Sequence, residues 1–222
     1  TGSNGKTTTT LLTYHLLKEA GFSVGLAGNI GESLAKQVID DSYEYYVLEL
    51  SSFQLDNMYE FKADIAILLN ITPDHLDRYE YKIENYIASK YRIFQNMTSE
   101  EYTISFLEDS ILSQTFPNIN TKHLGISLEK SVENGVSLKG KKLIFKLKNK
   151  QCELSLDTIK LKGVHNLVNS CASILVALTL DISLEKIRTA LQTFKNAEHR
   201  LEAVSYTHLR AHETDSYLVC RL

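Results

Sequence analysis

The chain opens with the stretch TGSNGKTTT, residues 1–9, which contains the end of the pattern G-x-x-x-x-G-K-[S/T]. In this motif backbone N–H groups surround phosphate oxygens, the lysine reaches the outer phosphates and the hydroxyl meets Mg²⁺. The first glycine of the pattern would fall one position before Thr1. A phosphate loop connects a buried strand to the helix after it, so we expect that strand to precede Thr1 in a longer protein. An ordinary turn before a helix would also explain this stretch taken alone.

The composition is that of an ordinary globular protein, with 43% hydrophobic and 23% charged residues in 222 positions. A net charge of −3 gives no electrostatic basis for binding nucleic acid or an anionic membrane. Apolar runs such as residues 66–69 are too short to cross a bilayer. Cys152, Cys171 and Cys220 are widely spaced and fit neither a disulfide framework nor a metal cluster, so we expect a reduced, cytoplasmic setting.

The apolar pattern of the first half of the chain predicts alternating helices and strands. Helical spacing over residues 6–20 is followed by Gly21, a typical helix C-cap. Near-continuous apolar runs at residues 45–50 and 63–70 are typical of parallel strands covered on both faces. Ligands of such sheets bind beyond the carboxyl ends of the strands, where we expect Glu49, Asn70 and His75.

The second half of the chain predicts an extension of this sheet. From about residue 122 to 161 the apolar period changes to two, which indicates a small antiparallel meander. Helical spacing returns at residues 165–180 and 183–194, where Ser183 is a good N-cap and Glu185 lies in the first turn. We therefore predict an α/β phosphate-loop domain with a mainly parallel, helix-flanked sheet and a small antiparallel extension. Further strands are expected at residues 23–27 and 102–106, and further helices at 32–39, 83–96 and 108–113.

Several polar side chains are expected to meet the loop at one edge of the sheet. Phosphoryl transfer needs positioning and charge neutralisation, for which Lys6 supplies a fixed positive charge and Glu49 and His75 supply metal ligands. Each residue alone has a simpler structural explanation. Glu49 could be an exposed rim carboxylate, His75 a helix cap and Lys90 a solvent-facing lysine. Their convergence with the loop favours a site.

Six stretches resemble, in order along the chain, the ATP-dependent Mur ligases of peptidoglycan synthesis. The form ELSSFQL, within the third of them, brings the chain nearest to the D-glutamate-adding members of that family. The six stretches are TGSNGKTT (1–8), GNIG (28–31), LELSSFQL (48–55), NITPDHLDRY (70–79), LKGVHN (161–166) and EHRLE (198–202).

The resemblance implies a reaction and a set of roles. ATP would phosphorylate the carboxylate of a UDP-linked muramoyl-alanine, and the amine of D-glutamate would attack the acyl phosphate to form an amide. Lys6, Lys90 and His75 would be catalytic, and Asn29 and Ser51 would lie near the substrate. Two Mg²⁺ sites would involve Thr7, Glu49, His75 and Lys90, the last as a carbamate. ATP would contact Gly2, Ser3, Asn4, Gly5, Lys6, Thr7, Thr8, Asn166, Asn169 and Arg200.

The resemblance also predicts how the chain is divided. Residues 1–203 would form a central ATP-binding domain that starts inside its phosphate loop, and the family's amino-terminal and carboxy-terminal domains would be missing. Residues 204–222 resemble the translation of a sequencing adapter and are left out of the fold prediction. Because a central strand would also be missing, we expect the isolated chain to be inactive and poorly folded.

Two alternatives remain open at this stage. The first is another amide-forming ligase, either a different Mur ligase or an enzyme like folylpolyglutamate synthase, which shares the loop and the chemistry. The second is a nucleotide-binding module without transfer chemistry.

Overall fold

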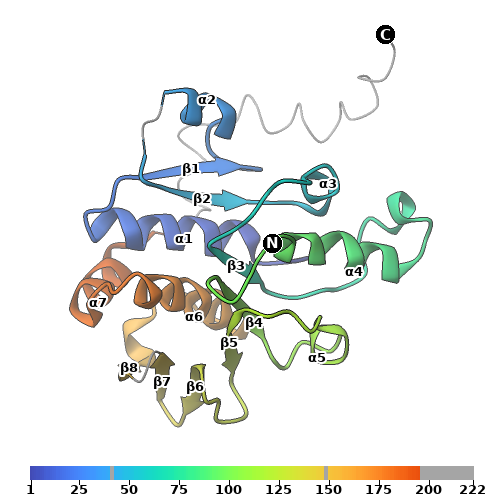
Figure 1. Ribbon diagram of the computed structural model, residues 1–222. Helices are drawn as coiled ribbons and strands as arrows, with labels where there is room; N and C mark the ends of the chain where they lie inside the picture. Colours follow the sequence, from blue (N-terminus) through green and yellow to red (C-terminus); the bar gives the residue numbers. More distant parts are fainter. Residues whose placement is uncertain (41–42, 148–149, 196–222) are drawn as a thin grey trace.

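Figure 1 shows the computed structural model of the chain, which describes residues 1–40, 43–147 and 150–195. Helices and strands alternate in the first half, as an α/β fold requires. The helices are α1 (Lys6–Glu19), α2 (Leu34–Ile39), α3 (Ser52–Leu55), α4 (Ile83–Tyr91), α5 (Leu112–Thr115), α6 (Val164–Thr179) and α7 (Leu184–Thr193). The strands are β1 (Val24–Gly28), β2 (Tyr45–Glu49), β3 (Ile65–Leu68), β4 (Tyr102–Phe106), β5 (Lys122–Ser127), β6 (Gly135–Lys139), β7 (Lys142–Leu147) and β8 (Lys150–Ser155).

The strands of the described residues form two sheets. β1 and β2 pair in parallel, with Gly28 opposite Glu49 at the end of the ladder. The second sheet has the order β3-β4-β5-β6-β7-β8. Its strands are parallel from β3 to β6, and β7 and β8 then run antiparallel to their neighbours. The predicted α/β fold with a mainly parallel sheet is confirmed.

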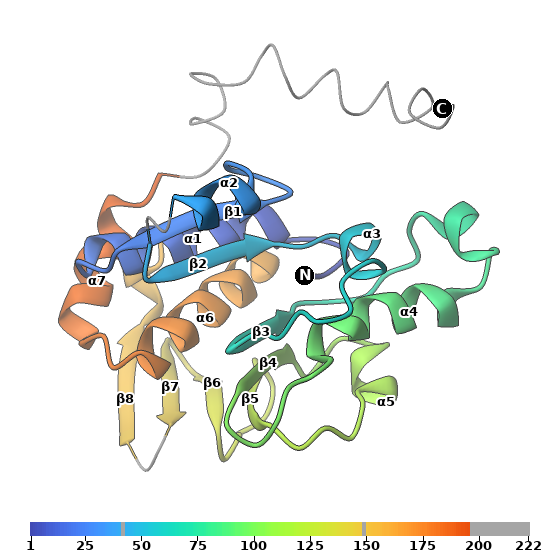
Figure 2. The same ribbon diagram turned by 45° about the horizontal axis from the view of Figure 1, so that its top comes forward.

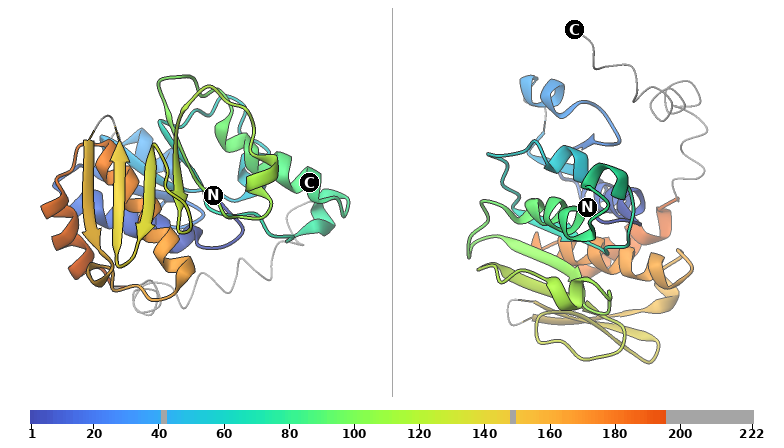
Figure 3. Two further views of the ribbon diagram at one scale, coloured as in Figure 1. Left: turned by 90° about the horizontal axis from the view of Figure 1, so that it is seen from below. Right: turned by 90° about the vertical axis from the view of Figure 1, so that its right-hand side faces the viewer.

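Helices cover one face of the larger sheet from β4 to β7 and the other face at β3. On one face α6 packs across β4 to β7 and against α1 (Figure 2), and residues of all these elements share one apolar core that includes Leu16, Ile104 and Phe145. On the other face of β3, a second core contains Leu68 together with Tyr86 of α4. α6 and α7 lie behind β6 to β8 in Figure 3. None of the helices in the described ranges is long and apolar enough to span a bilayer.

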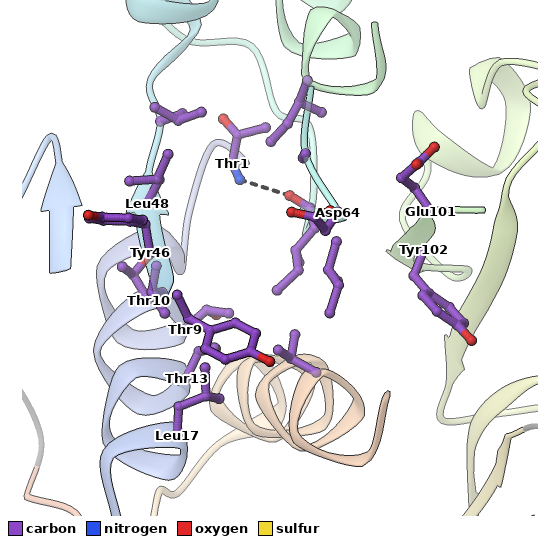
Figure 4. A pocket seen from close by; sticks show the side chains of 18 of the residues that line it. Thr1, Thr9, Thr10, Thr13, Leu17, Tyr46, Leu48, Asp64, Glu101 and Tyr102 are labelled. Carbon is purple, nitrogen blue, oxygen red and sulfur yellow. Dashed lines mark hydrogen bonds between the residues drawn. The ribbon is translucent and has the colours of Figure 1, made fainter. Parts of the chain in front are cut away.

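A groove lies between the two sheets. It is lined by β2 of one sheet and β3 of the other, and both are edge strands. Its volume is about 910 Å³. Figure 4 shows side chains of α1 and β2 around it, with Thr1 beside them. The Thr1 amino group donates to the Ile67 carbonyl at 2.8 Å, and the Leu69 N–H donates to the Thr1 carbonyl at 3.2 Å. Residue 1 therefore pairs with the open edge of β3.

Local signals at the helix ends are confirmed. α1 ends at Glu19, and the predicted glycine, Gly21, follows Ala20 with a φ of 94°. The Gly21 N–H donates to the Lys18 carbonyl and the Phe22 N–H to the Leu17 carbonyl, which is the paired arrangement of a Schellman motif. Ser183 caps α7 by accepting the Lys186 N–H.

Three other predictions are wrong. The antiparallel meander was expected to begin near residue 122, but β5 and β6 still run parallel to β4, because an alternating pattern identifies the buried face of a strand and not its direction. The helix expected at residues 108–113 begins only at Leu112, because the Asp109 carboxylate accepts the N–H groups of Ile111 and Leu112 at its start. The helix expected over 83–96 ends at Tyr91 and continues as a short 3-10 turn, Arg92–Phe94.

Candidate functional site

The phosphate loop leads directly into α1, whose N-cap is Gly5 in the left-handed region with a φ of 83°. The first N–H groups of an α-helix lack intrahelical acceptors, and no side chain caps this end. These donors and the helix dipole favour an anion here. The Lys6 ammonium folds back over the loop and donates to the carbonyls of Gly2 and Ser3, each at 3.0 Å. The predicted loop, helix end and lysine therefore lie together, in an arrangement that favours an anion.

Lys90 of α4 lies against the same loop. Its side chain is buried, and its ammonium donates at 3.0 Å to the Gly2 carbonyl that Lys6 also contacts. It lies 4.6 Å from the centre of the Tyr86 ring. Burial, followed by the positive charge of Lys6, lowers the pKa of Lys90 to about 7, although Asp74 opposes the shift. The alternative of a solvent-facing lysine is wrong, and much of this amine is neutral near pH 7.

Glu49 ends β2 and is only 2% exposed, so the alternative of a rim carboxylate is also wrong. Its Oε1 accepts a hydrogen bond from Asn29 Nδ2 at 2.9 Å, and its backbone carbonyl accepts the Asn29 N–H at 2.8 Å. Within the described residues its Oε2 is buried without a hydrogen-bond partner. An unpaired buried carboxylate oxygen is costly, and oxygen ligands of this kind suit a hard cation such as Mg²⁺. Glu49 therefore fits a metal ligand.

The residues after β3 hold the phosphate loop. The Ser3 N–H donates to the Asn70 carbonyl at 3.0 Å, and the Asn4 N–H donates to Asn70 Oδ1 at 2.8 Å. Asn70 Nδ2 donates in return to the Asn4 carbonyl at 3.0 Å. The Ser3 hydroxyl accepts the Thr72 N–H and donates to the Thr72 carbonyl. Sequence analysis placed Asn70 at this edge but gave it no role. Its only signal was a polar residue directly after a buried strand.

His75 and Ser51 have more peripheral surroundings. The His75 side chain is 55% exposed, with Nε2 lying 3.5 Å from Asp74 Oδ2 and its ring 5.1 Å from that of Phe53. His75 precedes the 3-10 turn Leu76–Tyr79 but makes no side-chain capping bond. The Ser51 hydroxyl caps α3 by accepting the Gln54 N–H, so this serine has a structural role.

The two asparagines predicted for the adenine side lie on α6. Asn169 is buried beside the loop, where a β-carbon on Gly5 would come within 2.4 Å of Asn169 Oδ1. Asn166 is half-buried, and its Nδ2 donates to the Lys162 carbonyl at 2.9 Å. Arg200 lies outside the described residues. In the described part of the chain no three His, Cys, Asp or Glu side chains form a metal cluster.

Comparison with known proteins identifies the family. The Mur ligase middle domain matches residues 1–177. The chain belongs to the Mur ligase family. The UDP-N-acetylmuramoylalanine--D-glutamate ligase of Cytophaga hutchinsonii is 49% identical over 207 residues, and that of Christiangramia forsetii is 46% identical over 206. Each match covers 92% of this chain and 46% of the relative, so the chain spans about half the length of the curated relatives it matches.

Solved Mur ligase structures share the fold. The MurF ligase of Thermotoga maritima in complex with ADP has a TM-score of 0.64 at 25% identity, covering 88% of this chain and 47% of that one. MurF of Acinetobacter baumannii has a TM-score of 0.65 at 18% identity, covering 90% and 46%.

In this Mur ligase domain, three charged groups surround Thr1. Burial, then the positive charges of Lys90 and Lys6, lower the pKa of the Thr1 amino group to about 5, and Glu49 acts in the opposite direction. Lys6, Lys90 and Glu49 therefore lie within electrostatic reach of one point, although they come from three separate elements. Sequence analysis predicted that Glu49 meets the loop at this sheet edge together with His75, but His75 is not among these three groups.

Proposed function

We propose that this chain is the ATP-binding middle domain of a cytoplasmic ligase that joins D-glutamate to UDP-N-acetylmuramoyl-L-alanine. The observation on which the proposal rests is the arrangement around the phosphate loop. Lys6 and Lys90 contact one carbonyl, and Glu49 offers an unpaired carboxylate oxygen nearby. The choice of substrates follows the names of relatives that are 46–49% identical over most of this chain.

The proposed reaction has two steps. Because a carboxylate is a poor electrophile, the γ-phosphoryl group of ATP first moves to it, which gives an acyl phosphate and ADP. The amine of D-glutamate then attacks the acyl carbon, phosphate leaves and the amide forms. Phosphoryl transfer depends mainly on positioning and on stabilising charge at the phosphoryl oxygens, which is what ordered cations and N–H donors provide.

The loop and α1 would hold the triphosphate. Lys6 would leave the Gly2 and Ser3 carbonyls for the β and γ phosphates, and the first N–H groups of α1 would donate to the same oxygens. Thr8 would lie in this helix end, and Thr7 would direct its hydroxyl at a metal ion. Bound Mg²⁺ would neutralise phosphate charge and polarise the substrate carboxylate. Thr7, Glu49, His75 and Lys90 would provide its protein ligands at two sites.

Lys90 would act as a carbamate. Its neutral amine, favoured by the lowered pKa, adds CO₂ to form N-carboxylysine and releases one proton. An ammonium thereby becomes an anionic oxygen ligand that suits Mg²⁺. The hydrogen bond to the Gly2 carbonyl already directs this side chain at the loop.

The remaining predicted residues would surround these groups. Asn29, which holds Glu49 Oε1, and Ser51 would face the muramoyl substrate. Asn166, Asn169 and Arg200 would lie on the adenine side, and Asn169 borders Gly5.

We further propose that residues 1–203 belong to one domain of a longer protein and that residues 204–222 are not native. A strand leading into Thr1 would fill the groove between β2 and β3. The open edges of both strands and the apolar side chains on the groove walls, such as Leu17, Leu48 and Ile67, support this placement.

The test is phosphate release by the full-length protein with UDP-N-acetylmuramoyl-L-alanine, ATP and a series of amino acids. We expect phosphate release when the amino acid is D-glutamate and not with any other amino acid. A Lys6→Ala variant should release no phosphate. Release with a different acceptor would favour another Mur ligase or a folylpolyglutamate synthase-like enzyme. ATP binding without release for any acceptor would favour a nucleotide-binding module.

A further inference from the structure

We propose that Asn70 is a positioning residue that holds the phosphate loop in its anion-binding shape, by fixing the two peptide planes on either side of Asn4. The inference rests on the proposed nucleotide site. It adds to that site a residue outside the phosphate loop, which lies just after the end of β3.

The contact between Asn70 and Asn4 is two-sided. The Asn70 carboxamide accepts the Asn4 N–H at 2.8 Å and donates to the Asn4 carbonyl at 3.0 Å. A carboxamide combines an acceptor and a donor at one end of a side chain, which a carboxylate or a hydroxyl cannot do in the same geometry. The Asn70 side chain therefore holds both the backbone N–H and the backbone carbonyl of Asn4.

The geometry of a trans peptide extends this effect to the neighbouring groups. The described residues contain no cis peptide bond, and in a trans peptide the C=O and N–H point in opposite directions. Because the Asn4 N–H faces Asn70, the Ser3 carbonyl points away from it, and Lys6 Nζ contacts that carbonyl at 3.0 Å. Because the Asn4 carbonyl also faces Asn70, the Gly5 N–H points away from Asn70 as well.

Other contacts attach the loop without fixing these planes. The Ser3 hydroxyl bonds to both polar backbone groups of Thr72, and the Ser3 N–H bonds to the Asn70 backbone carbonyl. These bonds do not involve the Asn70 side chain and survive its replacement. Loss of the carboxamide should therefore leave the loop in place but free the Asn4 peptide planes to rotate, because Asn4 is exposed to water.

The experiment measures Mg-ADP affinity by calorimetry in the full-length protein and in its Asn70→Ala and Asn70→Asp variants. We expect Asn70→Ala to bind about tenfold more weakly, since two hydrogen bonds of roughly 1 kcal/mol each are lost in part to water. Ionised Asn70→Asp accepts but cannot donate, whereas its protonated form does both. Its affinity relative to wild type should therefore recover as the pH falls, while the relative affinity of Asn70→Ala should stay constant.

A matched control separates positioning from general stability. Asn96 also joins two carbonyls through its carboxamide, those of Tyr59 and Phe61, and Asn96→Ala should lower the free energy of unfolding without changing Mg-ADP affinity. Undiminished binding by Asn70→Ala, or a pH-independent Asn70→Asp ratio, would overturn the role of Asn70. Failure of the wild-type protein itself to bind Mg-ADP would instead overturn the proposed nucleotide site.

Discussion

At the scale of single residues, Lys90 shows how position changes chemistry. A lysine on a helix is normally protonated at neutral pH, but this one is buried beside Lys6, and both effects disfavour its charge. The side chain is nonetheless well placed, because the Gly2 carbonyl and the Tyr86 ring contact its nitrogen. A buried and ordered amine that is partly neutral near pH 7 can act as a nucleophile. Lys82 is instead exposed and forms an ion pair with Glu80.

We therefore predict that the full-length protein takes up ¹³C-bicarbonate at Lys90, giving a carbamate resonance in its NMR spectrum. Because the neutral fraction falls as the pH drops through about 7, the resonance should weaken on the acidic side and grow above it. Lys90→Ala should lose both the resonance and the ligase activity, and added bicarbonate should not restore either. Lys82→Ala serves as the control and should retain both. Full activity in Lys90→Ala would refute the carbamate role.

At the scale of elements, the parallel pairing of β1 with β2 positions Glu49. Gly28 ends β1 with a φ of 102°, and a β-carbon there would lie 2.2 Å from the Glu49 carbonyl. That carbonyl accepts the Asn29 N–H, so the close approach also sets the contact between Asn29 and the Glu49 carboxylate. Only glycine allows this end of the ladder.

Gly28→Ala should accordingly cost more stability than the backbone conformation alone explains. Gly140 is the matched control, since it also has a positive φ but nothing within 4 Å of its β-carbon position. We expect Gly140→Ala to lower the free energy of unfolding by about 1 kcal/mol and Gly28→Ala by at least about twice that, measured by urea unfolding. Gly28→Ala should also weaken Mg²⁺-dependent nucleotide binding. Equal losses in the two variants would contradict the steric role of the Gly28 position.

The same elements indicate what sequence alone could predict. The ends of α1 and α7 follow from Gly21 and Ser183, because capping is decided by residues close in sequence. The phosphate loop and the convergence of Glu49 with it follow from the rule that sites lie beyond parallel strands. The direction of β5 and the two hydrogen bonds between the Asn70 side chain and the Asn4 backbone depend on contacts between residues distant in sequence. No local pattern encodes those contacts, so sequence analysis could not find them.

At the scale of the whole molecule, the groove between the sheets connects stability to the proposed site. β2 and β3 each leave one edge unpaired, and the groove walls are partly apolar. Thr1 lies at the start of the phosphate loop, and its partly buried amino group donates to the Ile67 carbonyl at 2.8 Å. A positive charge buried beside Lys6 and Lys90 opposes folding of any chain in which Thr1 has a free amine.

This arrangement predicts a pH dependence for the chain of residues 1–222. The Thr1 amine has a pKa of about 5 when folded and an ordinary value of 8.0, so the unfolded state binds more protons between these limits. The free energy of unfolding should rise by on the order of 4 kcal/mol from pH 5 to pH 8, and the same amount should be lost when the pH is lowered from 8 to 5. In the longer protein that we propose, residues before Thr1 would convert the amine to a peptide and provide a strand for the groove. The extended chain should therefore be more stable at every pH and should lack this slope in urea unfolding. Parallel pH profiles for the two chains would contradict the buried amine, and equal free energies of unfolding would contradict the strand in the groove.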